Sequence, residues 1–266
     1  MGSENIRFIA LDMDGTILDD EYRISEAVSR TLGSCKALGK KIIISTGRVR
    51  SSAAKHVEGK IQVDGFVCSN GADVYLGGFE PILEKHMDES LSRGLVQLSR
   101  RHESHFHAFI GDTWYYETER PYTAFYARRT GLEGIKLDFD SLRVLAFTKV
   151  LFIDDHERLL PIESELRSSY GGRVQIMYSS PKMLEVVVQG VSKASGLEAC
   201  VRALGGSLSE TMAFGDAEND EDMILAVGIG VAMGNASPDL KAKADFVAPG
   251  VDEDGVAVFL KDYFAI

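Results

Sequence analysis

The chain has 266 residues, of which 45% are hydrophobic and 26% charged, an ordinary composition for a globular protein with one large or two moderate domains. Its 29 Lys and Arg against 40 Asp and Glu give a formal net charge of −11, which makes nucleic acid and anionic membranes poor partners. No apolar run approaches the roughly 20 residues that span a bilayer, and no signal-peptide pattern opens the chain.

The two ends of the chain alternate between short apolar segments and helix-like segments, which predicts an α/β fold with a largely parallel sheet. The expected strands cover residues 6–11, 41–45, 65–68, 211–214 and 229–233. A helix is expected over 25–38, another beginning at Ser237-Pro238, and a last one over 256–264. Three widely spaced cysteines fit the reduced thiols of a cytoplasmic protein.

The middle of the chain has a different pattern, with a hairpin signal and most of the aromatic residues. Strand-like residues 106–110 and 113–117 flank the turn pair Gly111-Asp112. Further strands are expected over 150–153, 174–178 and 184–188, with a helix over 156–169. We expect an α+β domain at 82–184, inserted into a core domain formed by 1–81 and 185–266.

Two carboxylates, Asp12 and Asp14, follow the first expected strand. Side chains at positions i and i+2 of an extended segment point the same way, and neighbouring carboxylates repel each other. A fold keeps such a pair for a divalent cation with oxygen ligands, or for nucleophilic and proton-transfer chemistry. The residues alone leave both explanations open.

Polar clusters follow four of the expected strands. They are Asp12/Asp14, Ser45-Thr46-Gly47-Arg48, Asn70-Gly71, and residues 215–220 with Asp216 and Asp220. Open α/β sheets gather ligands at the carboxyl ends of their strands, so these clusters are expected to meet at one edge. The acidic groups suit Mg²⁺, and the hydroxyl and glycine backbone donors suit phosphate oxygens.

These motifs, with Lys193 and Asn219, resemble the haloacid dehalogenase superfamily in order and spacing. The chain is most similar to the Cof-like sugar-phosphate phosphatases, in which a large α/β cap is inserted into a Rossmann-like core. The resemblance extends to residues 191–193 and 233–236 and covers nearly the whole chain. Ala194 stands where many relatives have Gly after the lysine, and we expect no change in chemistry from that difference.

The resemblance implies a role for each motif residue. Asp12 would be the nucleophile, and Asp14 the general acid and base, whose pKa must then rise above the usual value of about 3.9. Asp12, the Asp14 backbone carbonyl and Asp216 would hold Mg²⁺, with Asp220 supporting through a water or from outside the direct ligands of the ion. The phosphoryl group would be bound by Thr46, Gly47, Lys193 and Asn219.

The expected function is therefore a Mg²⁺-dependent phosphatase that acts on a small phosphorylated metabolite, with a sugar phosphate as first choice. A phosphosugar mutase or phosphotransferase would use the same aspartyl-phosphate, and a non-catalytic phosphate-binding module is the alternative from another class. The inserted cap would select the substrate. We expect a monomer or weak homodimer.

Other residues have simpler interpretations. Arg48 is expected to pair with a carboxylate of the core domain. His102, His105 and His107 invite a metal site, but exposed positions on the hairpin explain them better. Trp114 and the nearby tyrosines either stack on a sugar or form the small domain's own core, and the sequence leaves that choice open.

Overall fold

A computed structural model describes residues 5–78 and 80–266, which form two compact units. The first unit contains Met1–Leu83 and Ser192–Ile266, and the second contains Glu84–Val191. The expected boundary between 184 and 185 is wrong, because it cuts strand β11 (Met183–Val188), which pairs with two strands of the second unit. The inserted unit therefore extends seven residues further than expected.

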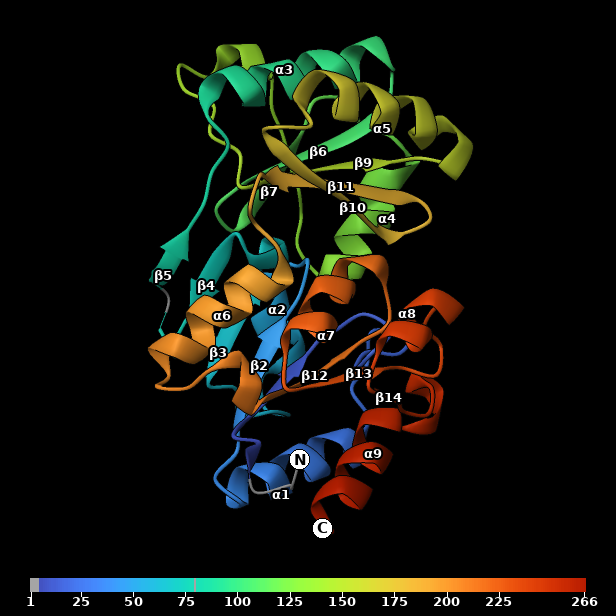
Figure 1. The fold of residues 1–266 in the computed structure, drawn as a ribbon. Helices are drawn as coiled ribbons and strands as arrows, with labels where there is room; N and C mark the ends of the chain where they lie inside the picture. The colour runs from blue at the N-terminus through green and yellow to red at the C-terminus, as the bar shows by residue number, and fades with distance from the viewer. Residues whose placement is uncertain (1–4, 79) are drawn as a thin grey trace. The chain divides into compact units, whose positions relative to one another are not determined.

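The first unit is built on a mostly parallel eight-stranded sheet in the order β14-β13-β12-β1-β2-β3-β4-β5 (Figure 1). Its strands are β1 (Phe8–Leu11), β2 (Lys41–Ser45), β3 (Gly65–Cys68), β4 (Asp73–Tyr75), β5 (Pro81–Glu84), β12 (Thr211–Gly215), β13 (Ile229–Ala232) and β14 (Phe246–Val247). The pairings from β14 to β3 are parallel, and β3 pairs with β4 antiparallel. The Rossmann-like core predicted from the alternating pattern is confirmed.

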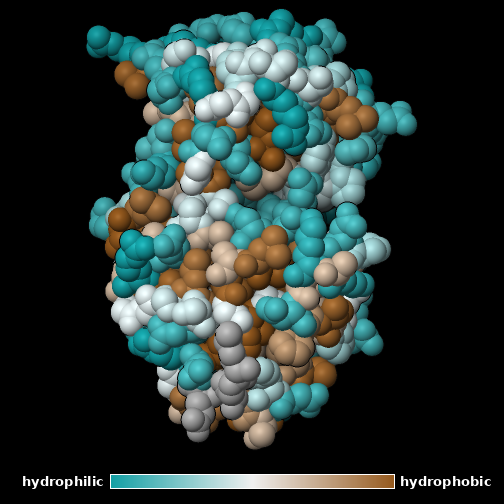
Figure 2. Space-filling view, in the orientation of Figure 1, coloured by the Kyte–Doolittle hydropathy of each residue, from teal (hydrophilic) through white to brown (hydrophobic). Residues whose placement is uncertain are grey.

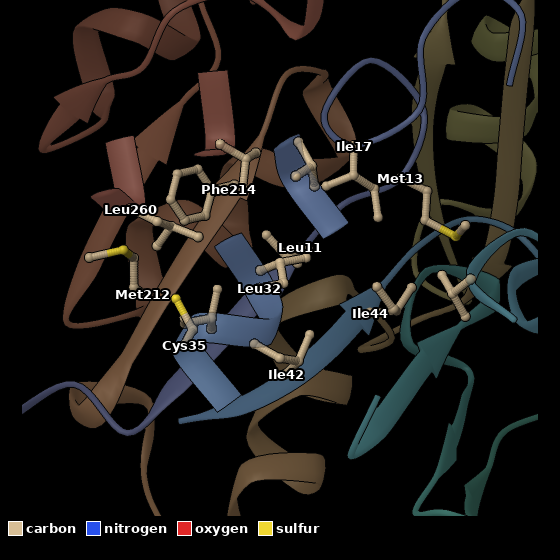
Figure 3. Packing of buried hydrophobic residues seen from close by; sticks show 14 of the residues in the cluster. Leu11, Met13, Ile17, Leu32, Cys35, Ile42, Ile44, Met212, Phe214 and Leu260 are labelled. Carbon is tan, nitrogen blue, oxygen red and sulfur yellow. The ribbon is translucent and has the colours of Figure 1, made fainter. Parts of the chain in front are cut away.

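Helices cover both faces of this sheet because its strands are apolar on both sides. One face buries Leu11 and Phe214 against α1 and α9, as Figure 3 shows for the cluster around Leu32 and Leu260. The other face buries Ala10 against α6 and α7. The helices of this unit are α1 (Glu26–Ala37), α2 (Arg50–Val57), α6 (Lys193–Ala203), α7 (Glu221–Ala226), α8 (Pro238–Lys243) and α9 (Gly255–Phe264).

Serine side chains fix where three of these helices begin. Ser25 Oγ accepts a hydrogen bond from Val28 N at the start of α1, and Ser237 Oγ does the same from Leu240 N at the start of α8. Both helices begin where the sequence predicted. Ser192 caps α6, which places Lys193 at the first helical position.

The second unit contains a six-stranded sheet in the order β10-β11-β9-β6-β7-β8, and only the β7–β8 pairing is parallel among the described pairs. Its other strands are β6 (His105–Ile110), β7 (Thr113–Tyr116), β8 (Ile135–Lys136), β9 (Lys149–Ile153) and β10 (Val174–Ser180). Its helices are α3 (Glu89–Arg101), α4 (Pro121–Thr130) and α5 (His156–Tyr170). The outer surface of α3 and α5 is mainly hydrophilic (Figure 2). The predicted α+β unit and its hairpin are confirmed.

The expected exposure of the histidines is wrong for two of the three. His105 is 2% exposed and His107 0%, and their Nε2 atoms lie 2.7 Å apart. The cause is that β6 is an interior strand whose polar face is covered by tyrosines from α4, with Tyr126 4.7 Å from His107 between ring centroids. Trp114, 1% exposed, packs against the same ring and so belongs to this unit's interior.

The third histidine, His102, is half-buried, and its Nε2 lies 2.7 Å from a Glu165 oxygen.

Among the residues that the structure describes, no helix combines the length and apolar character needed to cross a membrane.

Candidate active site

The chain makes a tight turn where β1 ends, and this turn carries the first acidic pair. Asp12 N donates to Phe214 O at 3.0 Å, which extends the β1–β12 pairing into the site. Gly15 has a φ of +80°, in the left-handed region that favours glycine. A Cβ on Gly15 would overlap the Asp216 carboxylate, with Cγ only 2.8 Å away. Glycine therefore lets the first loop approach the loop after β12.

Three carboxylates from two distant parts of the chain form the centre of the site. Asp12, Asp216 and Asp220 each offer an oxygen that lies within 4.8 Å of the others. Asp12 is 5% exposed and Asp220 is fully buried. The convergence expected from the carboxyl ends of parallel strands is thus present in the structure.

Lys193 lies between two of these carboxylates. Its Nζ is 2.6 Å from Asp12 Oδ1 and 2.6 Å from Asp220 Oδ1, and the side chain is fully buried. Burial lowers the pKa of Lys193, but the two carboxylates raise it more, so the amine stays charged. Composition and pattern alone would have made this residue a surface lysine, and only the resemblance singled it out.

Asp220 is engaged through both of its oxygens. While Oδ1 accepts from Lys193, Oδ2 accepts from the backbone N–H groups of Asp216 at 3.0 Å and Ala217 at 3.1 Å. A carboxylate committed in this way braces the loop after β12. Asp12 and Asp216 are therefore better suited than Asp220 to bind a metal directly.

The charges of the cluster fit a divalent cation. With all three carboxylates ionised, the ammonium would compensate only one of them, and a bound cation favours that ionised state. Burial, then the Asp220 carboxylate, raises the pKa of Asp12 to about 7. Burial, then Asp12 and Asp220, raises the pKa of Asp216 to about 8. Asp216 Oδ1 is buried with no hydrogen-bond partner among the described residues, so an oxygen ligand is available there.

The Asp14 side chain lies apart from this cluster and pairs with Arg48. Arg48 Nε and Nη2 donate to Asp14 Oδ2 at 2.8 Å and Oδ1 at 2.7 Å, a two-pronged arrangement. The expectation that Arg48 pairs with a core carboxylate is confirmed. Since Arg48 is 5% exposed and Asp14 only partly buried, the pair lies at the border of the site.

The predicted phosphate-binding residues other than Lys193 come from two loops. Thr46 follows β2, is 1% exposed, and its Oγ1 accepts from Arg48 N at 3.2 Å, with Gly47 between them half-buried. Asn219 belongs to the loop after β12 and is 8% exposed. Its Nδ2 donates to Asn70 Oδ1 at 3.0 Å.

Two asparagines in the site had no role in the sequence analysis. Asn70 had been noticed only as a turn residue of the third polar cluster. Asn235 Nδ2 donates to Gly15 O at 2.8 Å and to Asp216 Oδ2 at 3.2 Å, so it ties the first and last acidic loops together. Asn235 lies in segment 233–236, which resembles the family in sequence. That resemblance alone does not predict which groups Asn235 contacts.

An open, mostly parallel sheet with an acidic cluster at the carboxyl ends of its strands defines a class of α/β enzymes that bind ligands at that edge. The family model of the haloacid dehalogenase-like hydrolases matches residues 9–260 of the sequence. The chain therefore belongs to this family.

Curated relatives cover most of the chain. It is 31% identical over 240 residues to the HMP-PP phosphatase of Serratia proteamaculans, an alignment that covers 89% of this chain and 86% of the relative. It is 30% identical over 260 residues to the 5-amino-6-(5-phospho-D-ribitylamino)uracil phosphatase of Bacillus subtilis, which covers 97% and 96%. Both relatives are named phosphatases, so the expected enzyme class, a phosphoric monoester hydrolase of this family, is confirmed.

Solved structures of the same family superpose along the whole chain. A haloacid dehalogenase-like hydrolase from Bacteroides thetaiotaomicron has a TM-score of 0.86 at 28% identity, covering 97% of this chain and 99% of that one. A sugar phosphatase of the family's subclass IIB has a TM-score of 0.87 at 25% identity, covering 98% and 100%. The fold of this chain is therefore that of the family.

Proposed function

We propose that this protein is a Mg²⁺-dependent phosphatase that hydrolyses a small phosphorylated metabolite, with sugar phosphates as first choice, through an aspartyl-phosphate on Asp12. One observation carries the proposal. A buried lysine lies 2.6 Å from both Asp12 and Asp220, beside a third carboxylate, although Lys193 and Asp12 are 181 residues apart in the chain.

The donor set suits the metal. Asp12, Asp216 and the Asp14 backbone carbonyl would hold Mg²⁺, with Asp220 bracing the loop, and the ion would neutralise charge on the transferring phosphoryl group. The incompletely compensated carboxylates of the cluster and the unpartnered Asp216 Oδ1 support a divalent cation there.

The reaction divides into two transfers of the phosphoryl group. A carboxylate oxygen of Asp12 attacks phosphorus, the bond from phosphorus to the leaving oxygen breaks, and that oxygen takes a proton from Asp14. A water then gives its proton to Asp14 and its oxygen to phosphorus, which releases inorganic phosphate and restores Asp12. For either step the Asp14 carboxyl must leave its pairing with Arg48.

The phosphoryl oxygens would be held by donors from two loops and from the first turn of α6. These donors are the Thr46 hydroxyl, the Gly47 N–H, the Lys193 ammonium and the Asn219 amide. Donors fixed before the reaction stabilise developing negative charge at little reorganisation cost. Because Lys193 also contacts Asp12, it is suited to keep the nucleophile ionised.

Substrate class is supported by the relatives. The two curated relatives are named as phosphatases of HMP-PP and of 5-amino-6-(5-phospho-D-ribitylamino)uracil, and one structural neighbour is described as a sugar phosphatase. We propose that the inserted second unit serves as the cap that selects among such substrates. A monomer or weak homodimer in the cytoplasm, without nucleic-acid or membrane partners, stays a prediction.

The test is release of inorganic phosphate from a panel of phosphorylated sugars, with and without Mg²⁺, and with water as the sole acceptor. Wild-type protein should release phosphate only with the metal, and Asp12→Asn should lower the rate by at least about 10³-fold. Asp20→Asn, an exposed carboxylate on the same loop, is the matched control and should leave the rate unchanged.

Near wild-type release by Asp12→Asn would remove Asp12 from the nucleophile role. Turnover that needs a sugar acceptor and releases little phosphate in water alone would favour the mutase or phosphotransferase alternative.

A further inference from the structure

We propose that Asn70 is a positioning residue of this site. The left-handed turn at residues 69–71 uses the Asn70 side chain to orient Asn219 toward the phosphoryl group. This inference rests on the proposed function, because it assigns a task to Asn219 in phosphate binding.

The backbone of this turn is strained in a way seen nowhere else in the described residues. Ser69 and Asn70 have φ values of +50° and +57°, and they are the only adjacent non-glycine residues in the described chain with positive φ. Gly71 follows with a φ of +99°. Such a conformation costs on the order of 1 kcal/mol for a residue such as Ser69 and less for an asparagine, and it persists where the surroundings over-determine it.

Asn70 connects two loops that carry candidate phosphate-binding residues. The side chain is fully buried. Its backbone N–H donates to Thr46 O at 3.1 Å, and its Oδ1 accepts from Asn219 Nδ2 at 3.0 Å. Asn70 thus connects the loop after β2 with the loop after β12. It lies 149 positions from Asn219 in the sequence.

The turn also lies against the start of α6. A Cβ on Gly71 would overlap the backbone carbonyl of Ser192, and a Cβ on Gly196 would come within 2.7 Å of Gly71 Cα. Ser192 is the residue that caps the helix beginning at Lys193. The same short turn therefore contacts the three segments that supply Thr46, Lys193 and Asn219.

The hydrogen bond to Asn70 gives Asn219 a defined orientation. An amide nitrogen carries two hydrogens, and Asn70 Oδ1 accepts one of them. The second hydrogen is left for another acceptor, and a phosphoryl oxygen is the acceptor that the proposed function supplies. Without Asn70, the Asn219 amide would be free to rotate and would lose this preset direction.

The experiment compares Asn70→Gly with wild type, using acetyl phosphate as substrate and inorganic phosphate as ligand. Glycine removes the amide and adopts positive φ without strain, but the buried hydrogen bond to Asn219 is lost, so the melting temperature should fall slightly while the fold is kept. We expect kcat/KM to fall at least tenfold and phosphate binding to weaken at least tenfold. Ala265→Gly relieves the same backbone conformation at the end of α9 and should change neither quantity.

A double-mutant cycle separates positioning from a structural role. Asn219→Ala should lose a similar amount of kcat/KM, and Asn70→Gly combined with Asn219→Ala should stay within about threefold of Asn219→Ala alone. Losses that multiply independently would overturn the proposal, as would Asn70→Gly values within twofold of wild type.

Failure of the proposed function has a separate signature. Wild-type protein would then bind inorganic phosphate but release none from any phosphoester. The comparison of phosphate binding between wild type and Asn70→Gly still decides the positioning role in that case, and equal binding, or none by wild type, overturns it.

Discussion

Lys193 shows how one buried charge organises the site. It neutralises one of three crowded carboxylates and contacts the proposed nucleophile directly. Removing one partner of a buried ion pair leaves the others without compensation, which costs about 3–5 kcal/mol.

Lys193→Met should therefore lower the free energy of unfolding by an amount of that order and lower kcat at least 100-fold. Chemical denaturation and phosphate release measure the two effects. Lys60→Met, at an exposed position, is the matched control and should preserve both. An active, stable Lys193→Met protein would contradict the assigned role.

Single residues also show what the sequence could reveal. The Asp12/Asp14 pair and the Asp216 cluster were readable because each follows an apolar strand, and parallel strands bring such ends together. The sequence indicated that Arg48 pairs with a carboxylate of the core, but it did not identify Asp14 as the partner, because that pairing depends on how two loops meet. The burial of His105 and His107 was missed because an alternating hairpin gives no sign of the helix that covers it.

At the scale of elements, the first turn of α6 connects helix capping with the site. Ser192 Oγ accepts from Ser195 N, and Ser195 Oγ accepts from Ser192 N in return. This reciprocal pair fixes the helix at the residue that presents Lys193.

Ser192→Ala should cost about 1 kcal/mol of stability and also lower kcat/KM severalfold, because the first helical residue loses its fixed place. Ser25→Ala removes the equivalent cap of α1 and should cost a similar amount of stability with no loss of activity. Equal activities of the two variants would show that capping of α6 does not position Lys193.

Strands were the most predictable elements. Residues 41–45 and 65–68 were placed with the bounds that the structure has, because short apolar runs bounded by polar turns have few other interpretations. Helices α3 and α4 were not predicted, because aromatic, strand-like residues dominate the middle of the chain. The misplaced boundary in β11 has a tertiary cause, because only strand pairing shows to which unit a strand belongs.

At the scale of the whole molecule, the two units should respond to different solution conditions. Mg²⁺ should raise the melting temperature of the chain, because a ligand that binds only the folded cluster stabilises it by mass action. Asp216→Asn should abolish most of that shift, and Asp252→Asn, an exposed carboxylate, should keep it. Calorimetry measures the melting temperature of each protein without Mg²⁺ and at Mg²⁺ concentrations that increase in tenfold steps. A shift that Asp216→Asn retains in full would contradict the prediction.

The second unit should lose stability in acid through its buried histidines. Burial, and to a smaller extent the charge of Arg120, lowers the pKa of His105 to about 4. The Asp154 carboxylate opposes this shift, but its effect is smaller. Burial, then His105 and Lys149, lowers the pKa of His107 as well. The unfolded chain takes up these protons near pH 6.5, so stability is full above that value and falls as pH decreases toward about 4.

For His105 the loss is about 3 kcal/mol over this window. The chain has one tryptophan, and Trp114 lies 4.3 Å from His107 between ring centroids, so its fluorescence reports the unfolding of this unit. His105→Gln should flatten the dependence on pH, whereas His156→Gln, at an exposed position, should leave it unchanged. A wild-type unfolding midpoint that stays constant from pH 7 to 4.5 would contradict the prediction.

Covalent labelling of Asp12 is the most direct measurement of the proposed chemistry. The protein is mixed with ³²P-labelled acetyl phosphate and Mg²⁺, quenched in acid within the first turnover, and digested into peptides. The proposal predicts label on the peptide that contains Asp12, lost on longer incubation as free phosphate appears. Release of phosphate with no label ever found on that peptide would contradict it.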